Sequence, residues 1–165
     1  MKGKQKKAPE AQTFRAGVGA IIMNKNGKIL GLERKDFPGE WQFPQGGLDE
    51  DETPLEAVKR EILEETGIKE SDLQLVTEES PLLAYELPKE TRSIKIGRGQ
   101  VQRWFLFQFT GSDEVITLGD KKEFRAWKWT SMDEMKATVV SFKQPVYQEL
   151  AEYFLQHLEN TEGED

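Results

Sequence analysis

The chain has 165 residues, a formal net charge of −7 and no cysteine. This length predicts one domain with a sizeable core, and the absence of cysteine excludes disulfides and thiolate metal sites. The acidic balance argues against an extended nucleic-acid-coating surface, so we expect any RNA contact to be local, around a phosphate-bearing end. His157 is the only histidine, which argues against a histidine-based zinc site or a Ser–His triad.

The chain shows no apolar run that approaches the length of a membrane span. Its basic start is not followed by the apolar core of a signal peptide. We therefore expect a soluble, cytoplasmic protein.

The two ends of the chain differ in composition from its middle. Residues 1–12 are lysine-rich and carry little to bury, so they are predicted to form a flexible tail. Residues 161–165 are predicted to form a flexible acidic end. Residues 13–160 are expected to form the single folded domain.

The first folded segment is predicted to be a hairpin. Residues 14–23 are rich in β-formers and small residues, which predicts a strand. Residues 24–27 carry turn signals, and a second strand is expected near residues 28–34.

A segment with two adjacent glycines, WQFPQGG, occupies Trp41 to Gly47. Glycine permits unusual backbone angles and lets a phosphate approach backbone N–H groups closely. The segment precedes a predicted helix N-terminus, where anions bind favourably. It therefore predicts a cradle for phosphate.

A helix is predicted from about Thr53 or Pro54 to Thr66. Thr53 can cap the helix, Pro54 suits its first turn and Gly67 supplies its end. With these ends, Leu55, Val58 and Ile62 fall on one apolar stripe, while Glu61, Glu64 and Glu65 cluster on another face.

Three carboxylates this close repel one another unless a cation neutralises them. Carboxylate oxygens suit Mg²⁺ or Mn²⁺, which complete their shells with water and substrate phosphate oxygens. The alternative interpretation is a solvated acidic helix face.

The remainder of the chain alternates strands and helices. Phe105, Phe107 and Phe109 alternate with other large side chains, which predicts a central strand buried on both faces rather than a base-stacking platform. The other predicted elements are a broken strand over 73–87, a loop over 88–99, a strand over 101–110, a strand over 124–130, a helix over about 132–137 and a helix over about 145–157.

The acidic helix and its flanks follow a specific spacing. Gly46 is followed after five residues by Glu52, and after seven more by Arg60-Glu61-Ile62, one residue, Glu64-Glu65, one residue and Gly67-Ile68. This resembles the signature of the Nudix hydrolases at all nine positions. The resemblance implies a metal-dependent pyrophosphohydrolase with an α/β/α sandwich fold and a mixed β-sheet.

Segments outside the signature resemble one Nudix subgroup. The bacterial RNA pyrophosphohydrolases, close relatives of the diadenosine tetraphosphate hydrolases, share FRAGVG, WQFPQGG, RWFLFQF, EFRAWKW and VVSFK. The resemblance implies removal of phosphate or pyrophosphate from 5′-triphosphorylated RNA, in the context of mRNA decay. The alternatives are hydrolysis of dinucleoside polyphosphates and a catalytically inactive nucleotide sensor. Neither DNA nor a membrane is expected as a partner.

The resemblance also implies roles for individual residues. The metal ions, Mg²⁺ or Mn²⁺ and more than one in number, are assigned to Gly46, Glu61, Glu64, Glu65 and Glu123. The four glutamates are the catalytic candidates, with Glu65 or Glu123 as general base. Substrate contacts are assigned to Arg15, Gln45, Gly46, Gly47, Val140, Phe142 and Lys143. Glu52, Arg60 and Gly67 are expected to hold the motif in shape, the first two through an ion pair.

One departure from the subgroup is Ala16-Gly17, where Pro-Asn is common. It bears on the positioning of Arg15.

Overall fold

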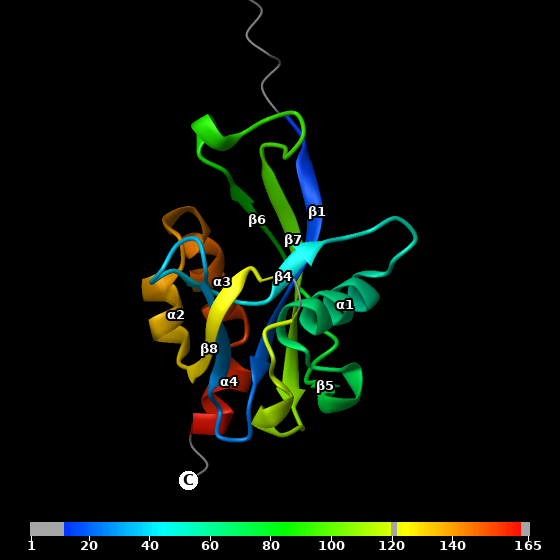
Figure 1. Cartoon of the computed structure of the whole chain (residues 1–165), viewed down its shortest axis with the longest axis vertical. Helices are drawn as coiled ribbons and strands as arrows, with labels where there is room; N and C mark the ends of the chain where they lie inside the picture. Colours follow the sequence, from blue (N-terminus) through cyan, green and yellow to red (C-terminus); the bar gives the residue numbers. More distant parts are fainter. Residues whose placement is uncertain (1–11, 120–121, 163–165) are drawn as a thin grey trace, which may run out of the picture.

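The computed structural model describes residues 12–119 and 122–162 (Figure 1). The predicted tail over residues 1–12 lies outside the described residues except for Gln12, and residues 163–165 of the predicted acidic end also lie outside them. Residues 161 and 162 belong to the last helix.

The described residues form one mixed sheet of eight strands, with helices on both sides. The strands are β1 (Phe14–Met23), β2 (Ile29–Arg34), β3 (Trp41–Gln42), β4 (Gln45–Gly47), β5 (Leu73–Leu75), β6 (Leu82–Glu86), β7 (Gly99–Phe109) and β8 (Phe124–Thr130). The helices are α1 (Pro54–Thr66), α2 (Met132–Thr138), α3 (Gln144–Tyr153) and α4 (Leu155–Glu162), with short 3₁₀ turns η2 (Lys89–Thr91) and η4 (Ser141–Lys143) among the connections.

The sheet is organised around β1 and β7, which run parallel in a continuous register from Phe14 opposite Gly99 to Met23 opposite Gln108. On its other side, β1 pairs with β4 near its start and with β2 only at its end, where Met23 faces Ile29. The sheet therefore splits beside β1. β4 lies in the split, next to α1 (Figure 1).

Each face of the sheet has its own apolar core, as an α/β/α sandwich requires. On one face, Val18, Ala20 and Ile22 of β1 pack with the fully buried Val58 and Ile62 of α1.

On the opposite face, Ile21 and Trp104 pack with Tyr147 and Leu150 of α3. The alternation of large residues along β7 fills both cores, because successive side chains of a strand point to opposite faces. The predicted sandwich with a mixed sheet is confirmed.

Helix α1 has the predicted ends. Thr53 Oγ1 accepts a hydrogen bond from the N–H of Glu56 at 3.2 Å, and Pro54 occupies the first turn. Gly67 adopts a left-handed φ of 77° and donates its N–H to the carbonyl of Leu63 at 2.9 Å. These caps satisfy backbone groups at both ends and fix which side chains face the sheet.

The last predicted helix is broken. Residues 144–153 and 155–162 form separate helices, with fully buried Phe154 at the break. Burial of this ring favours a helix boundary here that local helix propensity does not encode. None of the helices in the described ranges is long and apolar enough to cross a membrane.

Candidate active site

Strand β4 brings its backbone against the acidic face of α1. A Cβ atom built on Gly46 would lie 2.0 Å from the carboxyl carbon of Glu61, so only glycine leaves room for this carboxylate. Glu61 is 7% exposed. Neither Gly46 nor Gly47 has a positive φ, so unusual backbone angles, which we expected of both, are not what these glycines provide. At Gly46 the requirement is close approach of a carboxylate.

Glu65 lies beside the same strand and is 4% exposed. Its Oε2 accepts a hydrogen bond from the backbone N–H of Gln45 at 3.2 Å. α1 therefore turns Glu61 and Glu65 toward the β4 backbone, while half-buried Glu64 lies nearer the surface. The sequence placed the three glutamates on one helix face correctly, but it did not show that two of them are buried.

Arg60 ties the loop before α1 to the helix. Its guanidinium donates to both carboxylate oxygens of Glu52, at 2.7 and 2.9 Å, and to the carbonyl of Gly47 at 3.0 Å. It also donates to Glu61 at 2.8 Å and to Glu64 at 3.4 Å. The expected ion pair between Glu52 and Arg60 is thus present, as part of a larger network.

The electrostatic effect of this network is mutual. The hydrogen bond from Arg60, together with one from the backbone of Asp49, lowers the pKa of Glu52. In turn, the hydrogen bond to Glu52 raises the pKa of Arg60 above its usual value, and Glu61 contributes to that rise. The two-pronged geometry suits arginine and not lysine, because a guanidinium presents several N–H groups in one plane.

The donor set near β4 has the chemistry of a hard-cation site. Buried carboxylate oxygens of Glu61 and Glu65, with Glu64 beside them, are ligands that Mg²⁺ and Mn²⁺ prefer. Among residues 12–119 and 122–162, no group of three or more acidic or histidine side chains is gathered tightly enough to hold an ion as it stands. Glu61 and Glu64 both bond to Arg60 instead. The residues fit a divalent metal by donor type and burial, with Gly46 making room for the carboxylate of Glu61.

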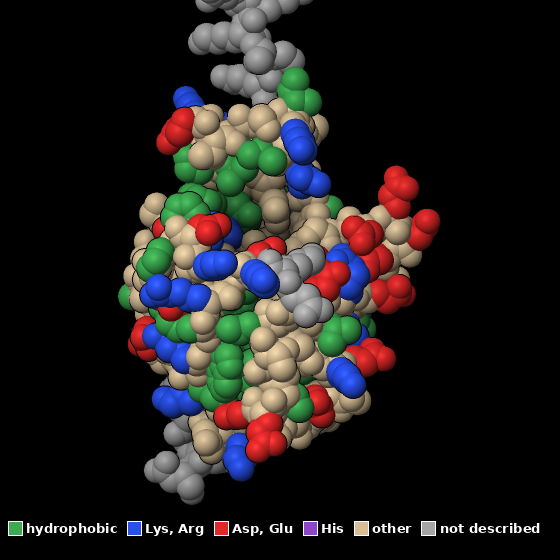
Figure 2. Space-filling view, viewed as in Figure 1, with side chains coloured by type: hydrophobic (Ala, Val, Ile, Leu, Met, Phe, Trp, Pro, Cys, Tyr) green, Lys and Arg blue, Asp and Glu red, His purple; other side chains and the backbone are tan. Residues whose placement is uncertain are grey.

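Figure 2 shows a hollow on the face that carries β4, which we call the cleft. Besides the α1 side, it has a second side at β6 and η4, where aromatic side chains and a buried cation gather. The ring of Phe142 in η4 lies 5.6 Å from the ring of Tyr85 in β6, centroid to centroid. Lys143 Nζ lies 5.4 Å from the centroid of the Tyr85 ring. Lys143 is 8% exposed, and no acidic group within the described ranges forms an ion pair with it. Val140 is half-buried at the start of the same turn.

The environment of Lys143 weakens its positive charge. Burial, reinforced by the nearby cation Arg34, lowers its pKa from 10.5 to about 8. The charges of Glu65, Glu40 and Glu123 oppose this change. Glu65 of α1 and Glu123, immediately before β8, are thus among the charges that act on Lys143.

A chain of side-chain amides connects the two walls. Gln102 in β7 donates to the side-chain carbonyl of Gln45 at 3.2 Å and to that of Gln100 at 3.1 Å. A side-chain interaction with Gln45 also acts on the hydroxyl of Tyr85, whose pKa is raised overall by burial.

Sequence reasoning missed Tyr85, Gln100 and Gln102. The available signal was in β7, where two glutamines occupy alternate positions in line with the buried Trp104. Polar residues at such buried, core-facing positions are unusual, and they mark a candidate site.

The segment Trp41–Gly47 is anchored by helix α3. The backbone N–H of Phe43 donates to the hydroxyl of Tyr147 at 2.8 Å, and the two rings stack with centroids 4.6 Å apart. Both side chains are fully buried. This contact with α3 therefore fixes the position of the segment that leads into β4.

The two remaining predicted residues lie at the rim. Arg15 is exposed at the start of β1 and donates to the carbonyl of Lys95 at 3.4 Å. Glu123 is exposed immediately before β8, and its backbone carbonyl accepts from the N–H of Lys35 at 2.9 Å. Their assigned roles stay predictions.

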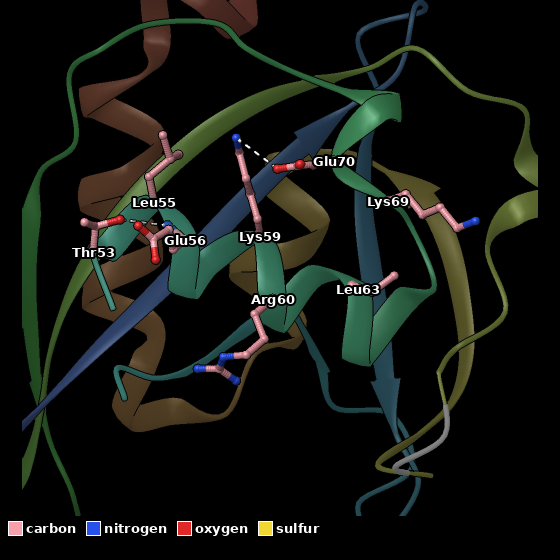
Figure 3. Close-up of a pocket in the computed structure, with 8 residues that line it drawn as sticks. All are labelled: Thr53, Leu55, Glu56, Lys59, Arg60, Leu63, Lys69 and Glu70. Carbon is pink, nitrogen blue, oxygen red and sulfur yellow. Dashed lines mark hydrogen bonds and ion pairs between the residues drawn. The ribbon is translucent and has the colours of Figure 1, made fainter. Parts of the chain in front are cut away.

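A separate groove of about 540 Å³ runs along the outer side of α1 (Figure 3). Its lining mixes apolar Leu55 and Leu63 with the Lys59–Glu70 ion pair, whose atoms are 3.5 Å apart. Figure 3 shows Lys59 and Arg60 leaving the helix in different directions. None of the three clustered glutamates lines this groove, so it is not the candidate active site.

Comparison with known proteins finds relatives over most of the chain. The NUDIX domain model matches residues 13–150. An RNA pyrophosphohydrolase of Cereibacter sphaeroides is 41% identical over 155 residues, which cover 91% of this chain and 96% of that protein. Nudix hydrolase 26, chloroplastic, of Arabidopsis thaliana is 42% identical over 156 residues, covering 88% of this chain and 71% of the relative.

Solved structures share the fold at lower identity. An Ap4A hydrolase of C. elegans has a TM-score of 0.66 and 20% identity, with 86% of this chain and 98% of that chain covered. The dihydroneopterin triphosphate pyrophosphohydrolase of E. coli has a TM-score of 0.69 and 21% identity, with 88% and 99% covered. Together with the motif on β4 and α1, the family model and the relatives show that the chain belongs to the Nudix hydrolase family.

Proposed function

We propose that this protein is an RNA 5′-pyrophosphohydrolase that acts on 5′-triphosphorylated RNA. Water attacks a phosphoanhydride bond, and phosphate or pyrophosphate leaves while the RNA keeps a shorter 5′ phosphate group. Residues 13–160 act as one catalytic domain in this proposal. A cytoplasmic site of action and a contribution to mRNA decay belong to the same proposal.

The observation that carries this assignment is the pairing of two features across one cleft. Carboxylates on α1 lie against β4, and two aromatic rings and a buried lysine, Tyr85, Phe142 and Lys143, gather at β6 and η4. Gln45 joins the two groups, because its backbone N–H binds Glu65 and its side chain interacts with Tyr85. RNA pyrophosphohydrolases from several bacteria are 38% to 41% identical to the chain over most of its length. A triphosphate end fits the first feature and its nucleotide fits the second.

Nudix hydrolases are generally dependent on divalent metals. In our proposal Glu61, Glu64 and Glu65, with Gly46 and Glu123, would hold Mg²⁺, which Mn²⁺ could replace. The bound ions would neutralise charge that develops on the phosphoryl oxygens and make water a better nucleophile.

The remaining chemistry falls to the protein's own residues. Glu65 or Glu123 takes the proton of the attacking water as general base. Arg60 and Glu52 hold the loop and the helix in register, so that Gly46 stays against Glu61.

On the opposite wall, the ring of Phe142 offers a face on which a base can stack. Lys143 and Arg15 supply positive charge to phosphate oxygens. Gln45 belongs to both walls, because its backbone N–H binds Glu65 while its side chain binds Gln102.

A direct test is phosphate release from 5′-triphosphorylated RNA, with the RNA product analysed for its remaining 5′ phosphates. We expect turnover that EDTA abolishes and that Mg²⁺ or Mn²⁺ restores. Binding of triphosphorylated RNA without any hydrolysis under these conditions would instead identify a Nudix-fold sensor.

A further inference from the structure

The charges around the cleft are strongly segregated. The segment 86–98, which consists of the last residue of β6 and the loop that joins β6 to β7, projects beyond β4 together with the start of β1 (Figure 1). We call it the β6–β7 arch. It carries four basic and two acidic residues, although the whole chain has a net charge of −7. Across the cleft, residues 48–56 carry five acidic residues and no basic one.

Figure 2 shows this separation on one face of the molecule. Blue side chains border the hollow on the side of the arch, and red side chains gather on the loop that leads into α1. A polyanion that enters the cleft is therefore attracted to one rim and repelled by the other.

Much of the basic charge on the arch is available for a ligand. Arg92 and Arg98 share one acid, Glu86, at 3.2 and 2.9 Å. Lys89 and Lys95 are exposed, and within the described ranges no acidic group pairs with either ammonium. Ion pairs within the arch therefore neutralise only part of its charge.

The arch is also held in a defined shape. Its tip is a tight turn in which the N–H of Gly97 donates to the carbonyl of Ser93 at 2.7 Å. Gly97 has a φ of 82°, and a Cβ there would approach the backbone oxygen of Thr13 to 2.8 Å. The N–H of Arg98 donates to the same oxygen at 2.9 Å. These contacts fasten the turn to β1 and present Lys95 at its tip.

Apolar surface accompanies this charge. Ile94 and Ile96 flank Lys95 and are 71% and 40% exposed. The guanidinium carbon of Arg98 lies 5.9 Å from the centroid of the Phe14 ring, which is itself 38% exposed. Exposed apolar and aromatic groups beside cations are the combination with which proteins bind single-stranded nucleic acid.

The position of the arch relates it to the substrate. Gln102, which binds Gln45 of β4, lies three residues along β7 from Gly99, where the arch ends. At about 3.3 Å per residue this is roughly 10 Å. An RNA whose 5′ end lies at β4 can reach the arch with its following nucleotides. Diadenosine tetraphosphate has no phosphodiester chain beyond its second nucleoside.

From these observations we propose that the β6–β7 arch binds the sugar-phosphate backbone of single-stranded RNA downstream of its 5′ end. This rests on the proposed function and adds a second contact surface beyond the triphosphate site. The arch thereby favours RNA chains over short dinucleotide substrates. The earlier expectation that RNA contacts are confined to the phosphate-bearing end is extended accordingly.

The test uses the charge-reversal variant Lys89→Glu/Lys95→Glu. The matched control, Lys25→Glu/Lys28→Glu, makes the same change at exposed lysines near the other end of β1, about 30 Å from the arch. kcat/KM is measured for a triphosphorylated dinucleotide and for a triphosphorylated RNA of about ten unpaired nucleotides.

We expect the arch variant to lose roughly 5- to 20-fold in kcat/KM on the longer RNA and little on the dinucleotide. For the parent, the plot of log kcat/KM against log salt should be steeper on the longer RNA, by about 0.7 for each phosphate contacted. The control variant should retain the parent's preference for length. Circular dichroism and thermal melting establish that all three proteins fold alike.

A second readout does not depend on hydrolysis. Fluorescence anisotropy of a labelled RNA of about ten nucleotides with a 5′ hydroxyl measures binding without the triphosphate contacts, and comparison of the parent with the arch variant isolates the contribution of the arch. The parent should bind it more tightly than the arch variant does.

Three results would overturn the proposal in distinguishable ways. Equal kcat/KM for short and long RNA in the parent, or equal losses in the arch and control variants, would exclude the arch while leaving the proposed function intact. Absence of turnover on every triphosphorylated RNA would overturn both.

Discussion

On the α1 side of the cleft, Arg60 divides one guanidinium among several acceptors, with distances of 2.7 Å to Glu52 and 2.8 Å to Glu61. On the η4 side, Lys143 is more deeply buried than Arg60, yet no acidic group in the described part of the chain forms an ion pair with it. Paired charges fix geometry, and a buried unpaired charge costs stability unless a ligand compensates it. Under the proposed function, the α1 side is the catalytic wall, and the η4 side is the binding wall, whose unpaired positive charge would interact with substrate phosphate.

The largest expected effect concerns the catalytic wall. Glu64→Gln keeps the shape of a half-buried side chain but removes its charge, so we expect the fold to persist and the rate to fall at least about 10²-fold. Turnover is measured over a range of Mg²⁺ concentrations. Near-normal turnover with unchanged Mg²⁺ dependence would remove Glu64 from the proposed ligands.

Gly46→Ala tests the contact between β4 and α1. The added Cβ would lie 2.0 Å from the carboxyl carbon of Glu61, so the carboxylate must move. Misplacement of a catalytic group by about 1 Å can cost roughly 10²-fold in rate, and we expect a loss of about that size.

Gly47→Ala is the matched control, because a Cβ on Gly47 would meet no heavy atom within 4 Å. Its Mg²⁺ dependence should match that of the parent and its loss of rate should be smaller than that of Gly46→Ala, while a rise in KM would report the substrate contact assigned to Gly47. If the two alanine variants are equally active, the contact between Gly46 and Glu61 has no catalytic role.

Phe142→Ala tests the binding wall. Loss of base stacking, worth about 1–3 kcal/mol, should lower kcat/KM on triphosphorylated RNA roughly 5- to 150-fold, with most of the change in KM. The Mg²⁺ dependence should match that of the parent, in contrast to Glu64→Gln. A defect in Mg²⁺ dependence would show that the two walls do not act separately.

The smallest expected effect is a pH dependence of Lys143. Because its pKa in the folded protein is about 8, the lysine loses its charge above that pH, and kcat/KM on RNA should fall a few-fold there. Lys143→Arg keeps its charge at higher pH, so this component of the decline should be absent. Identical pH profiles for the two proteins would exclude titration of Lys143 as the cause.

The same shift has a consequence for stability. The unfolded state, with a pKa near the ordinary 10.5, binds more protons at this residue than the folded state does between pH 8 and 10.5. The contribution of Lys143 to the free energy of unfolding should therefore rise with pH across that window.

The sequence predicted the elements that local signals control. β1, β8 and α1 have the predicted limits, because β-formers mark the strands while Thr53, Pro54 and Gly67 mark the helix. The positions of Glu61, Glu64 and Glu65 on one helix face followed from helical periodicity alone.

Features that depend on distant segments were not predictable in this way. The strand at β4 forms because Gln45–Gly47 pairs with β1, although glycine has little intrinsic preference for strands. The burial of Lys143 and the role of Tyr85 as its neighbour arise where η4 packs on β6. Nothing within either segment encodes that contact.

Turnover of triphosphorylated RNA and diadenosine tetraphosphate in one reaction mixture, with Mg²⁺ present, is the measurement that most directly tests the central claim. Both substrates carry phosphoanhydrides that the catalytic wall could cleave, so the ratio of their kcat/KM values reports the binding wall and the arch. Our account predicts that the ratio favours RNA in the parent and moves toward diadenosine tetraphosphate in the Lys89→Glu/Lys95→Glu variant. A parent enzyme that prefers diadenosine tetraphosphate would contradict it.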